Sequence, residues 1–460
     1  MGGAARHVAA PVRAPRHRIP RRPVRLMNDQ RQFFGHPRGL STLFFTEMWE
    51  RFSYYGMRGF LILYMTKALG FTDQHAGLAY GNYVSSVWLT PIIGGFIADR
   101  WLGQYRSVLI GGIIIALGHF TLAFHPLPFL YAGLTLIVLG TGLLKPNIST
   151  IVGSLYEPGD ERRDAGFSIF YMGINLGAFL GPLIAGKLAQ GVDWHLGFAC
   201  AGVGMVFGLI QYVLGRHHLQ PGIDRLDAQR RARLAAQTSG GTPQAPLTPE
   251  DWRRIGAVVV LFVFASLFWG AYEQAGSTLN LFADRYVHLE LLGVTLYASW
   301  FVSIQAAFVI LLSPIFAWLW VKLGPRQPSS PAKFALALLF VGVAFVLLIP
   351  AGSLAQSGVK VSPLWLVAAY FIQELGELCL SPVGLSLVTK LAPVRFVSLV
   401  MGIFFLSNAA GNWLAGWSAR FISTVPLVTL FGVTAAVTIG AGVVLFLLLR
   451  PIRNLMGGVR

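Results

Sequence analysis

Long apolar stretches of membrane-spanning length recur along this chain and constrain its fold more than any other feature. About twelve can be read, each close to or above the roughly 20 residues that an α-helix needs to cross a bilayer. They lie at residues 42–66, 76–98, 106–125, 128–152, 165–190 and 195–215, and then at 254–283, 291–321, 332–350, 363–390, 397–421 and 425–449. The pattern predicts an all-α membrane protein.

A polar break at residues 216–253 separates the first six apolar stretches from the second six. It mixes charged residues with Gln, Gly and Pro, which is typical of a solvated linker, and we expect one short amphipathic helix at 224–237. The second and eighth stretches end alike, in TPIIGGFIADRWLG (90–103) and SPIFAWLWVKLG (313–324), which indicates duplicated halves. We therefore expect two six-helix bundles, 41–215 and 254–450, flanked by a basic tail at 1–40 and a short tail at 451–460.

The strong positive charge is distributed as membrane topology requires. The chain has 36 Lys and Arg against 19 Asp and Glu, which taken alone would suit a nucleic-acid binder. If both termini are cytoplasmic, roughly 28 of these bases fall on cytoplasmic segments, as the positive-inside rule demands. Five fall outside, namely Lys67, Lys187, Arg285, Lys360 and Arg420. We therefore expect a multi-pass membrane protein with both termini in the cytoplasm and no nucleic-acid partner; the sequence leaves open whether translation starts at Met1 or Met27.

The two cysteines, Cys200 and Cys379, lie inside apolar stretches and lack the spacing of metal ligands. We expect both to be free core thiols. The chain also shows no nucleophile or metal cluster of the kind that an enzyme needs. We therefore expect no enzyme activity, no metal and no cofactor.

Eight charged residues remain inside the predicted spans, where each costs roughly 2.5 to 3.5 kcal/mol at the centre of a helix. They fall only on the first, fourth, seventh and tenth spans: Glu47, Glu50, Arg51, Arg58, Lys145, Glu273, Glu374 and Glu377. These spans are equivalent in duplicated halves, so the charges should converge on one central cavity. Five acids against three bases leave carboxylates without a cation, which favours proton uptake. A purely structural network is the alternative, but it does not explain why both signs line one cavity.

The spacing in the first span places its polar residues on one helical face. These residues are Glu47, Glu50, Arg51, Tyr54, Tyr55 and Arg58. A rise of ~1.5 Å per residue places Arg58 and Glu273 at similar depths, so the two can pair near the outer mouth. The same estimate lets Lys145 reach Glu50 or Glu377 from the inner side.

Residues 47–56, EMWERFSYYG, resemble the ExxERFxYYG signature of the proton-dependent oligopeptide transporter family. Other stretches similar to that family follow in order: GGFIADR (94–100), LKPN (144–147), FSIFYMGINLGAF (167–179), EQAGS (273–277) and ELCLSPVG (377–384). The resemblance implies the major facilitator fold in a bacterial inner membrane. It also implies a proton-coupled symporter that imports di- and tripeptides by alternating access, and we expect a monomer.

The resemblance implies a substrate site with both charge signs. Arg51 and Lys145 would hold the peptide carboxylate, and Glu377 would hold the ammonium group. Asn175 would assist the ammonium end or the peptide backbone. Pockets for the variable side chains would be lined by Tyr54, Tyr55, Tyr83, Trp300, Ser381 and Trp413.

The resemblance also assigns coupling and gating. Proton coupling would fall to Glu47, Glu50, Arg51 and Glu273. Arg58 with Glu273 would close the outer gate, and Lys145 with Glu377 would close the inner gate.

The sequence departs from the family at three places. Gln305 and Ala306 stand where an Asn and a Pro are frequent, so one peptide contact is in doubt. The second span has no proton-binding His of the animal type, so carboxylates should carry the protons. The linker is too short for the two extra spans of many bacterial relatives.

Other transport functions remain as alternatives. A nitrate carrier has no use for an acid such as Glu377, and a sugar carrier should show more amides and fewer charges. A drug carrier stays open. A channel is disfavoured by gates at two depths.

Overall fold

The computed structural model describes residues 32–157, 159–238, 248–291, 293–391 and 397–456. These parts are mainly helical, and they include one antiparallel hairpin of the two-residue strands β1 (Glu290–Leu291) and β2 (Val294–Thr295), in which Glu290 faces Thr295. Within them, nine segments are long and apolar enough to cross a membrane by length and composition. The helix that carries Glu47, Glu50, Arg51 and Arg58 falls outside that group because it holds four charges.

The first helical group packs around α1. Its members are α1 (Gly39–Leu63, continued by a π-helical turn Tyr64–Ala68), α2 (Asp73–Ile97, continued by a π-helical turn Ala98–Leu102), α3 (Gln104–Leu122), α4 (Leu127–Ser154), α5 (Arg162–Gly191) and α6 (Trp194–Leu214). α1 packs against α5 and α6, and α3 packs against α4.

The second helical group contains α8 (Pro249–Tyr272), α9 (Thr278–Tyr286), α10 (Trp300–Leu323), α11 (Ser330–Gln356), α12 (Leu364–Leu391), α13 (Val397–Ala419), α14 (Leu427–Leu447) and α15 (Leu449–Leu455). The predicted span 254–283 is interrupted by a 3-10 turn, Glu273–Gly276, between α8 and α9. The predicted span 291–321 was wrong at residues 291 and 293–299, because the hairpin and a turn precede α10, and residue 292 lies outside the described residues. Turn residues such as Gly293 explain this, since its φ of +78° belongs to a hairpin rather than a helix.

The linker contains α7 (Arg216–Thr238), a longer helix than the expected 224–237. α7 is fixed to the first helical group: Arg225 Nη1 donates to Ser154 O at 3.1 Å, and Arg230 Nη1 donates to Trp101 O at 3.2 Å. Residues 239–247 of the linker and most of the basic tail lie outside the described residues.

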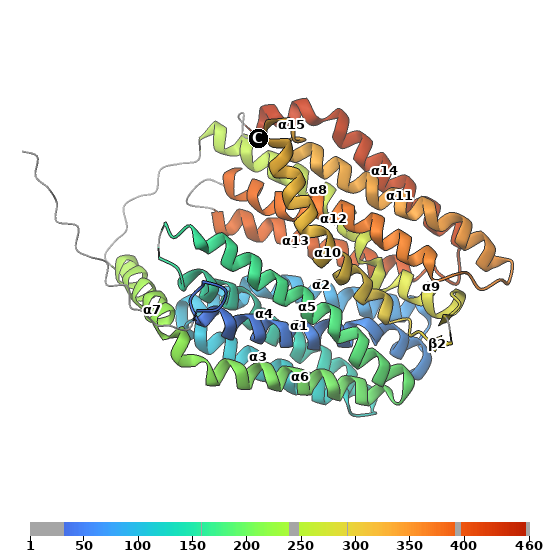
Figure 1. Cartoon of the computed structure of the whole chain (residues 1–460), viewed down its shortest axis with the longest axis horizontal. Helices are drawn as coiled ribbons and strands as arrows, with labels where there is room; N and C mark the ends of the chain where they lie inside the picture. Colours follow the sequence, from blue (N-terminus) through green and yellow to red (C-terminus); the bar gives the residue numbers. More distant parts are fainter. Residues whose placement is uncertain (1–31, 158, 239–247, 292, 392–396, 457–460) are drawn as a thin grey trace, which may run out of the picture.

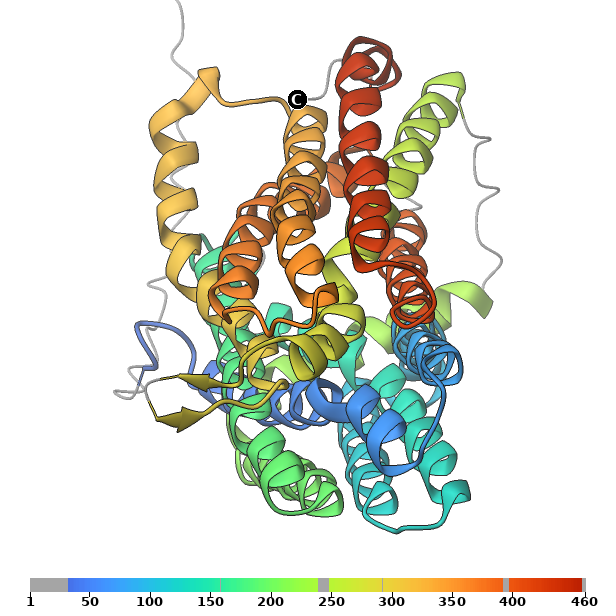
Figure 2. The same cartoon turned by 90° about the vertical axis from the view of Figure 1, so that its right-hand side faces the viewer.

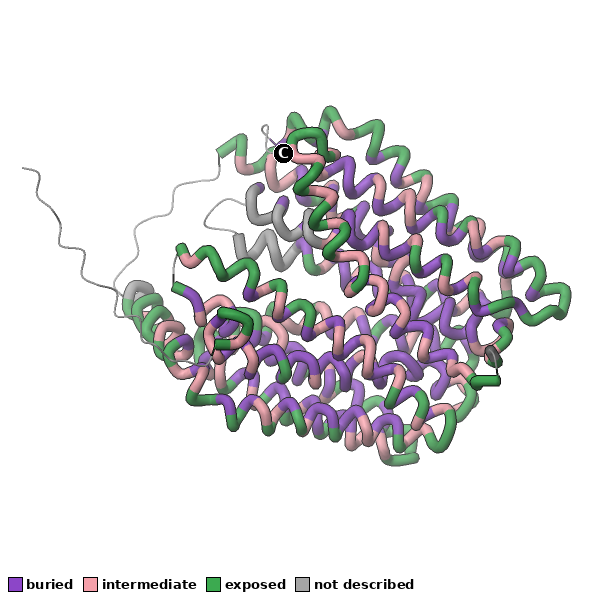
Figure 3. Tube along the Cα trace, viewed as in Figure 1, coloured by how far each residue is buried: buried purple, intermediate pink, exposed green. Residues whose placement is uncertain are grey.

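The two helical groups lie side by side, with α1 to α6 below and α8 to α14 above in Figure 1. α7 lies at the left, which we call the linker end, and α9 and β2 lie at the right, which we call the hairpin end. Figure 2 looks onto the hairpin end, with the β-hairpin in front. Buried residues run through the interior of the molecule and are most continuous toward the hairpin end (Figure 3). Across the two groups, α2 contacts α13 and α5 contacts α10.

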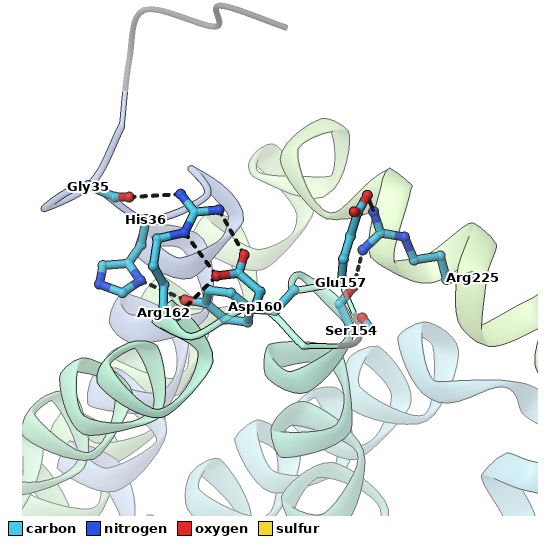
Figure 4. Close-up of polar contacts among 8 residues, drawn as sticks. Gly35, His36, Ser154, Glu157, Asp160, Arg162 and Arg225 are labelled. Carbon is cyan, nitrogen blue, oxygen red and sulfur yellow. Dashed lines mark hydrogen bonds and ion pairs between the residues drawn. The ribbon is translucent and has the colours of Figure 1, made fainter. Parts of the chain in front are cut away.

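The loop between α4 and α5 joins the segment before α1 at the linker end (Figure 4). Tyr156 Oη lies 3.0 Å from His36 Nδ1, and Arg162 Nη1 donates to Gly35 O at 3.3 Å. Arg162 also forms an ion pair with Asp160 at 2.8 Å. Hydrogen bonds from Arg162 lower the pKa of Asp160 to about 2.

Candidate functional site

A single guanidinium group on α1 is shared by two buried carboxylates. Arg51 Nη2 donates to Glu50 Oε1 at 2.7 Å, and Arg51 Nε lies 3.3 Å from Glu47 Oε1. Glu47 Oε2 is buried and has no hydrogen-bond partner among the described residues. The helical period predicted that these side chains share a face, and the contacts show it. If both carboxylates are ionised, this cluster carries net negative charge in a site that excludes water.

Arg58 and Glu273 form a buried ion pair between the two helical groups, as their estimated depths predict. Arg58 Nε also donates to Tyr80 Oη at 2.7 Å, and its Nη2 lies 3.5 Å from Asn412 Oδ1. The helix break brings the second group close enough for this. A Cβ on Gly276 would collide with Tyr80 Oη and lie 3.2 Å from Arg58 Nη2, so only glycine allows the approach.

Lys145 on α4 rests on an aromatic ring. Its Nζ lies 3.4 Å from the centroid of the Trp88 ring, a cation–π contact that the sequence did not reveal. Within the described residues, no carboxylate lies at ion-pairing distance from Lys145. The predicted pair of Lys145 with Glu377 is therefore not formed in this conformation.

The second helical group contributes two buried acids from α12, Glu374 and Glu377. Tyr272 Oη donates to Glu374 Oε1 at 2.7 Å. The Oε2 atoms of both acids have no hydrogen-bond partner in the described parts of the chain. Gln305, at the place where the family pattern is broken, donates through Nε2 to the side-chain oxygen of Gln373 at 3.2 Å.

The predicted aromatic pocket is partly assembled. Tyr54 and Tyr83 are buried, and their hydroxyls have no partner among the described residues, so both could receive a polar ligand. Tyr54 also lies under Arg51, whose Cζ is 5.2 Å from its ring centroid. Tyr55 and Ser381 are half-buried. Polar atoms thus remain available beside the charges.

Three other predicted residues have different surroundings. Asn175 Nδ2 donates to Tyr171 O at 3.0 Å, within its own helix. Trp300 Nε1 donates to Leu183 O at 3.1 Å, so its indole joins α10 to α5. Trp413 is 41% exposed. Of these three, Trp300 is engaged in the contact between the two helical groups.

Two further ion pairs join the groups at the hairpin end, and neither was predicted. Lys67 Nζ lies 2.8 Å from Asp284 Oδ1, and Arg285 forms a bidentate pair with Asp73 at 2.6 and 2.8 Å. The sequence indicated the two bases only as charges on the outer side. The signal available in the sequence was that Asp73 and Asp284 lie at the same end of their spans as Lys67 and Arg285. Among the described residues, every ion pair between the helical groups lies in the hairpin-end half.

Comparisons with known proteins agree with this architecture. The POT family profile matches residues 105–222 and 223–437. The uncharacterized transporter YclF of Bacillus subtilis (strain 168) is 41% identical, over 94% of this chain and 97% of the relative. The di-/tripeptide transporter of Lactococcus lactis subsp. cremoris is 37% identical, over 95% of this chain and 99% of the relative.

Solved structures match over similar lengths. A peptide transporter POT in complex with sulfate has a TM-score of 0.83 and 42% identity, over 93% of this chain and 97% of that one. A POT family transporter in complex with a thioalcohol conjugated peptide has a TM-score of 0.82 and 32% identity, over 91% of this chain and 98% of that one. The chain is a membrane transporter with the major facilitator fold rather than an enzyme, and it belongs to the POT family.

Proposed function

We propose that this chain is a symporter that uses inward proton flow to import di- and tripeptides by alternating access. The relatives named as peptide and di-/tripeptide transporters support the substrate class. The observation that carries the proposal is the buried sharing of Arg51 between Glu47 and Glu50.

A di- or tripeptide is a zwitterion and needs a cation at one end and an anion at the other. Arg51 and Lys145 provide cations from the first helical group, and Glu377 provides an anion from the second. Because Lys145 rests on a ring and not on a carboxylate, a peptide carboxylate can take it without displacing an acid. Tyr54 and Tyr83 offer aromatic faces that suit side chains of many shapes.

Proton coupling follows from competition for Arg51. The peptide carboxylate must share this guanidinium with Glu47 and Glu50, which already occupy it. Protonation of either acid removes one competitor and frees donors for the peptide. Proton and peptide therefore bind together, which is the requirement for symport.

Alternating access follows from the ion pairs that join the helical groups. Three of them close the hairpin end, and the positive-inside distribution supports placing that end outside the cell. Lys145 and Glu377 would pair only when the linker end closes. Their separation in a conformation closed at the hairpin end is what alternation between two gates requires.

We further propose a monomer in a bacterial inner membrane, with both termini in the cytoplasm. A cysteine added at either terminus should react with an impermeant maleimide only in inverted vesicles. Reaction in intact right-side-out vesicles would reverse the orientation.

The substrate proposal is tested with the purified protein in liposomes. An inward proton gradient should concentrate labelled dialanine, and di- and tripeptides should compete while free alanine and tetrapeptides should not. Competition by nitrate or a sugar, with none by peptides, would reassign the substrate.

The coupling proposal is tested with Glu47→Gln and Glu50→Gln. Each should abolish gradient-driven uptake and leave peptide counterflow partly active, because counterflow needs binding without net proton movement. Glu290→Gln, in the exposed hairpin, is the matched control and should change neither. Equal loss of both activities in the α1 variants would remove these acids from coupling.

A further inference from the structure

Glu374 on α12 is a buried acid that the transport cycle described so far does not use. It is 0% exposed, and its Oε1 accepts a hydrogen bond from Tyr272 Oη at 2.7 Å. Its Oε2 is also buried, without a hydrogen-bond partner among the described residues. One neutral hydroxyl is therefore the polar contact that holds this carboxyl group.

No cation of the described residues lies at ion-pairing distance from Glu374. The charged groups in electrostatic range are two further acids, Glu377 and Glu273, and the tyrosines that face it are Tyr272 on α8 and Tyr171 on α5. Of these two acids, Glu273 is paired with Arg58, so Glu377 is the acid in range that has no cation at ion-pairing distance among the described residues.

The helices packed against α12 do not supply a cation from their ends. α12 contacts α8, α10, α11 and α13, and the sequence of α13 contains no charged residue. The charges on the other three lie near the linker end: Glu250, Asp251, Arg253, Arg254, Lys322 and Lys333. Arg254 is 18 residues before Tyr272, about 27 Å away along the helix. On α12 itself, Lys390 is 16 residues beyond Glu374, about 24 Å away.

An ionised carboxylate in these surroundings is costly. Burial without a cation costs several kcal/mol per ion, whereas a neutral acid that accepts one hydrogen bond from Tyr272 avoids most of this penalty. Glu374 therefore carries a proton in the conformation with the hairpin end closed.

The position of Tyr272 connects this proton to the gate. Tyr272 ends α8, and the next residue, Glu273, holds Arg58 across the two helical groups. Opening the hairpin end must separate Arg58 from Glu273. The end of α8, which carries Tyr272, must move with the break that follows it. That movement removes the hydrogen bond and admits water from the hairpin side to Glu374.

Glu377 follows Glu374 by three residues, on the same helical face and nearer the linker end. Its Oε2 is also without a described partner. A proton that leaves Glu374 Oε2 can be taken up by the Glu377 carboxylate and then pass to water at the linker side. Protonated Glu377 no longer attracts a peptide ammonium group, so this transfer would favour peptide release.

We propose that Glu374 is a second proton-binding carboxyl of the transporter, loaded from the hairpin side when the gate opens and discharged through Glu377 with the peptide. This rests on the proton–peptide symport proposed above. It adds one proton per peptide to those carried by Glu47 and Glu50.

The experiment measures stoichiometry in liposomes of the full chain, from the steady-state accumulation of labelled dialanine at a series of imposed membrane potentials. Glu374→Gln keeps the shape and an oxygen acceptor for Tyr272 but cannot carry a proton. The variant should move one proton fewer per peptide. For each membrane potential of about 59 mV, this lowers the steady-state accumulation of peptide roughly tenfold. Wild-type stoichiometry in this variant overturns the proposal, whereas failure of wild type to accumulate peptide contradicts the symport itself.

A matched pair of tyrosine variants tests the role of the hydrogen bond. Tyr272→Phe should shift the pH of half-maximal uptake while leaving the stoichiometry unchanged, because the acid is still present. Tyr370→Phe is the control, since Tyr370 is buried on α12, the helix that carries Glu374, and its hydroxyl has no hydrogen-bond partner among the described residues. Equal pH profiles for the two variants would show that Tyr272 does not act on Glu374.

Infrared spectroscopy provides a readout that does not need transport. Wild type should show a buried carboxylic-acid C=O band that Glu374→Gln removes, and persistence of the band overturns the proposal. If Glu374→Gln does not fold, Tyr272→Phe should move the band by removing the hydrogen bond to Oε1, while Tyr370→Phe should not. An unmoved band in Tyr272→Phe would also overturn the proposal.

Discussion

Arg58 on α1 and Glu273 in the break after α8 form a buried ion pair that joins the two helical groups. Tyr80 Oη accepts a hydrogen bond from the same guanidinium at 2.7 Å. Loss of one partner leaves the other charge buried without compensation, which costs about 3 to 5 kcal/mol. The conformation closed at the hairpin end depends on this pair more than on the neighbouring pairs Lys67–Asp284 and Arg285–Asp73, whose basic side chains are more exposed to solvent.

Glu273→Gln should therefore favour an open hairpin end. Ser299 is 0% exposed between the two groups, where its backbone N–H donates to Gln190 Oε1 at 3.1 Å. In a background of Cys200→Ala and Cys379→Ala, Ser299→Cys reports opening through its rate of maleimide labelling. We expect Glu273→Gln to raise that rate at least tenfold, in line with the lost ion pair.

Two variants control this measurement. Lys67→Met removes a pair whose lysine side chain is 50% exposed, worth about 0 to 1 kcal/mol, and should change labelling little. Arg58→Met combined with Glu273→Met removes both charges and should label more slowly than either single variant. Equal labelling in wild type and Glu273→Gln would deny the pair a gating role.

The cation–π contact of Lys145 with Trp88 predicts an unusual gain of affinity. The contact contributes about 0.5 to 2 kcal/mol and must be given up, at least in part, when Lys145 turns to a peptide carboxylate. Trp88→Leu should then tighten dialanine binding by about 2- to 30-fold, measured by calorimetry. Weaker binding would mean that Trp88 instead holds Lys145 in the position that receives the peptide.

The loop cluster at the linker end gives a pH prediction with a definite sign. Arg162 lowers the pKa of Asp160 to about 2, so the stabilisation is present above the ordinary carboxyl pKa and is lost only as the pH falls through about 2. Asp160→Asn should therefore reduce the hydrogen-exchange protection of residues 33–38, corrected for intrinsic rates, by the same factor at pH 5 and pH 7.5. A smaller loss at pH 5 than at pH 7.5 would contradict this.

The helical period predicted which residues share a face of one helix. The rise per residue predicted which residues of two helices lie at the same depth. The α1 face that holds Glu47, Glu50 and Arg51 follows from spacing alone, and the pairing of Arg58 with Glu273 follows from the rise per residue. Both depend on geometry that every α-helix shares, which is why the sequence was sufficient.

Other contacts between helices were not predicted. At the break from Glu273 to Gly276, Tyr80 and Arg58 of the first group occupy the space that a Cβ on Gly276 would need. The cation–π contact of Lys145 with Trp88 and the hydrogen bond from Tyr272 to Glu374 each join two different helices. Neither contact leaves a periodic pattern in the sequence. The apolar residues of the hairpin before α10 extend the hydrophobic run of that helix, so hydrophobicity alone predicts helix there.

Close backbone contact between α2 and α13 adds a final condition for closing the hairpin end. A Cβ on Gly77 would lie 2.6 Å from Gly416 O and 3.1 Å from Arg420 N. A Cβ on Gly416 would lie 2.6 Å from Gly77 O. The two distances of 2.6 Å are too short for a real Cβ, so the helices can meet here only because both positions are glycine.

Gly77→Ala should therefore push the two helical groups apart and raise labelling at Ser299→Cys, as loss of the ion pair does. Gly440→Ala is the matched control, because a Cβ at Gly440 in α14 meets nothing within 4 Å. That substitution should leave labelling unchanged and stabilise the helix by roughly 0.5 to 1 kcal/mol. If Gly77→Ala also leaves labelling unchanged, closure tolerates a wider spacing of α2 and α13, and the ion pairs alone hold the hairpin end shut.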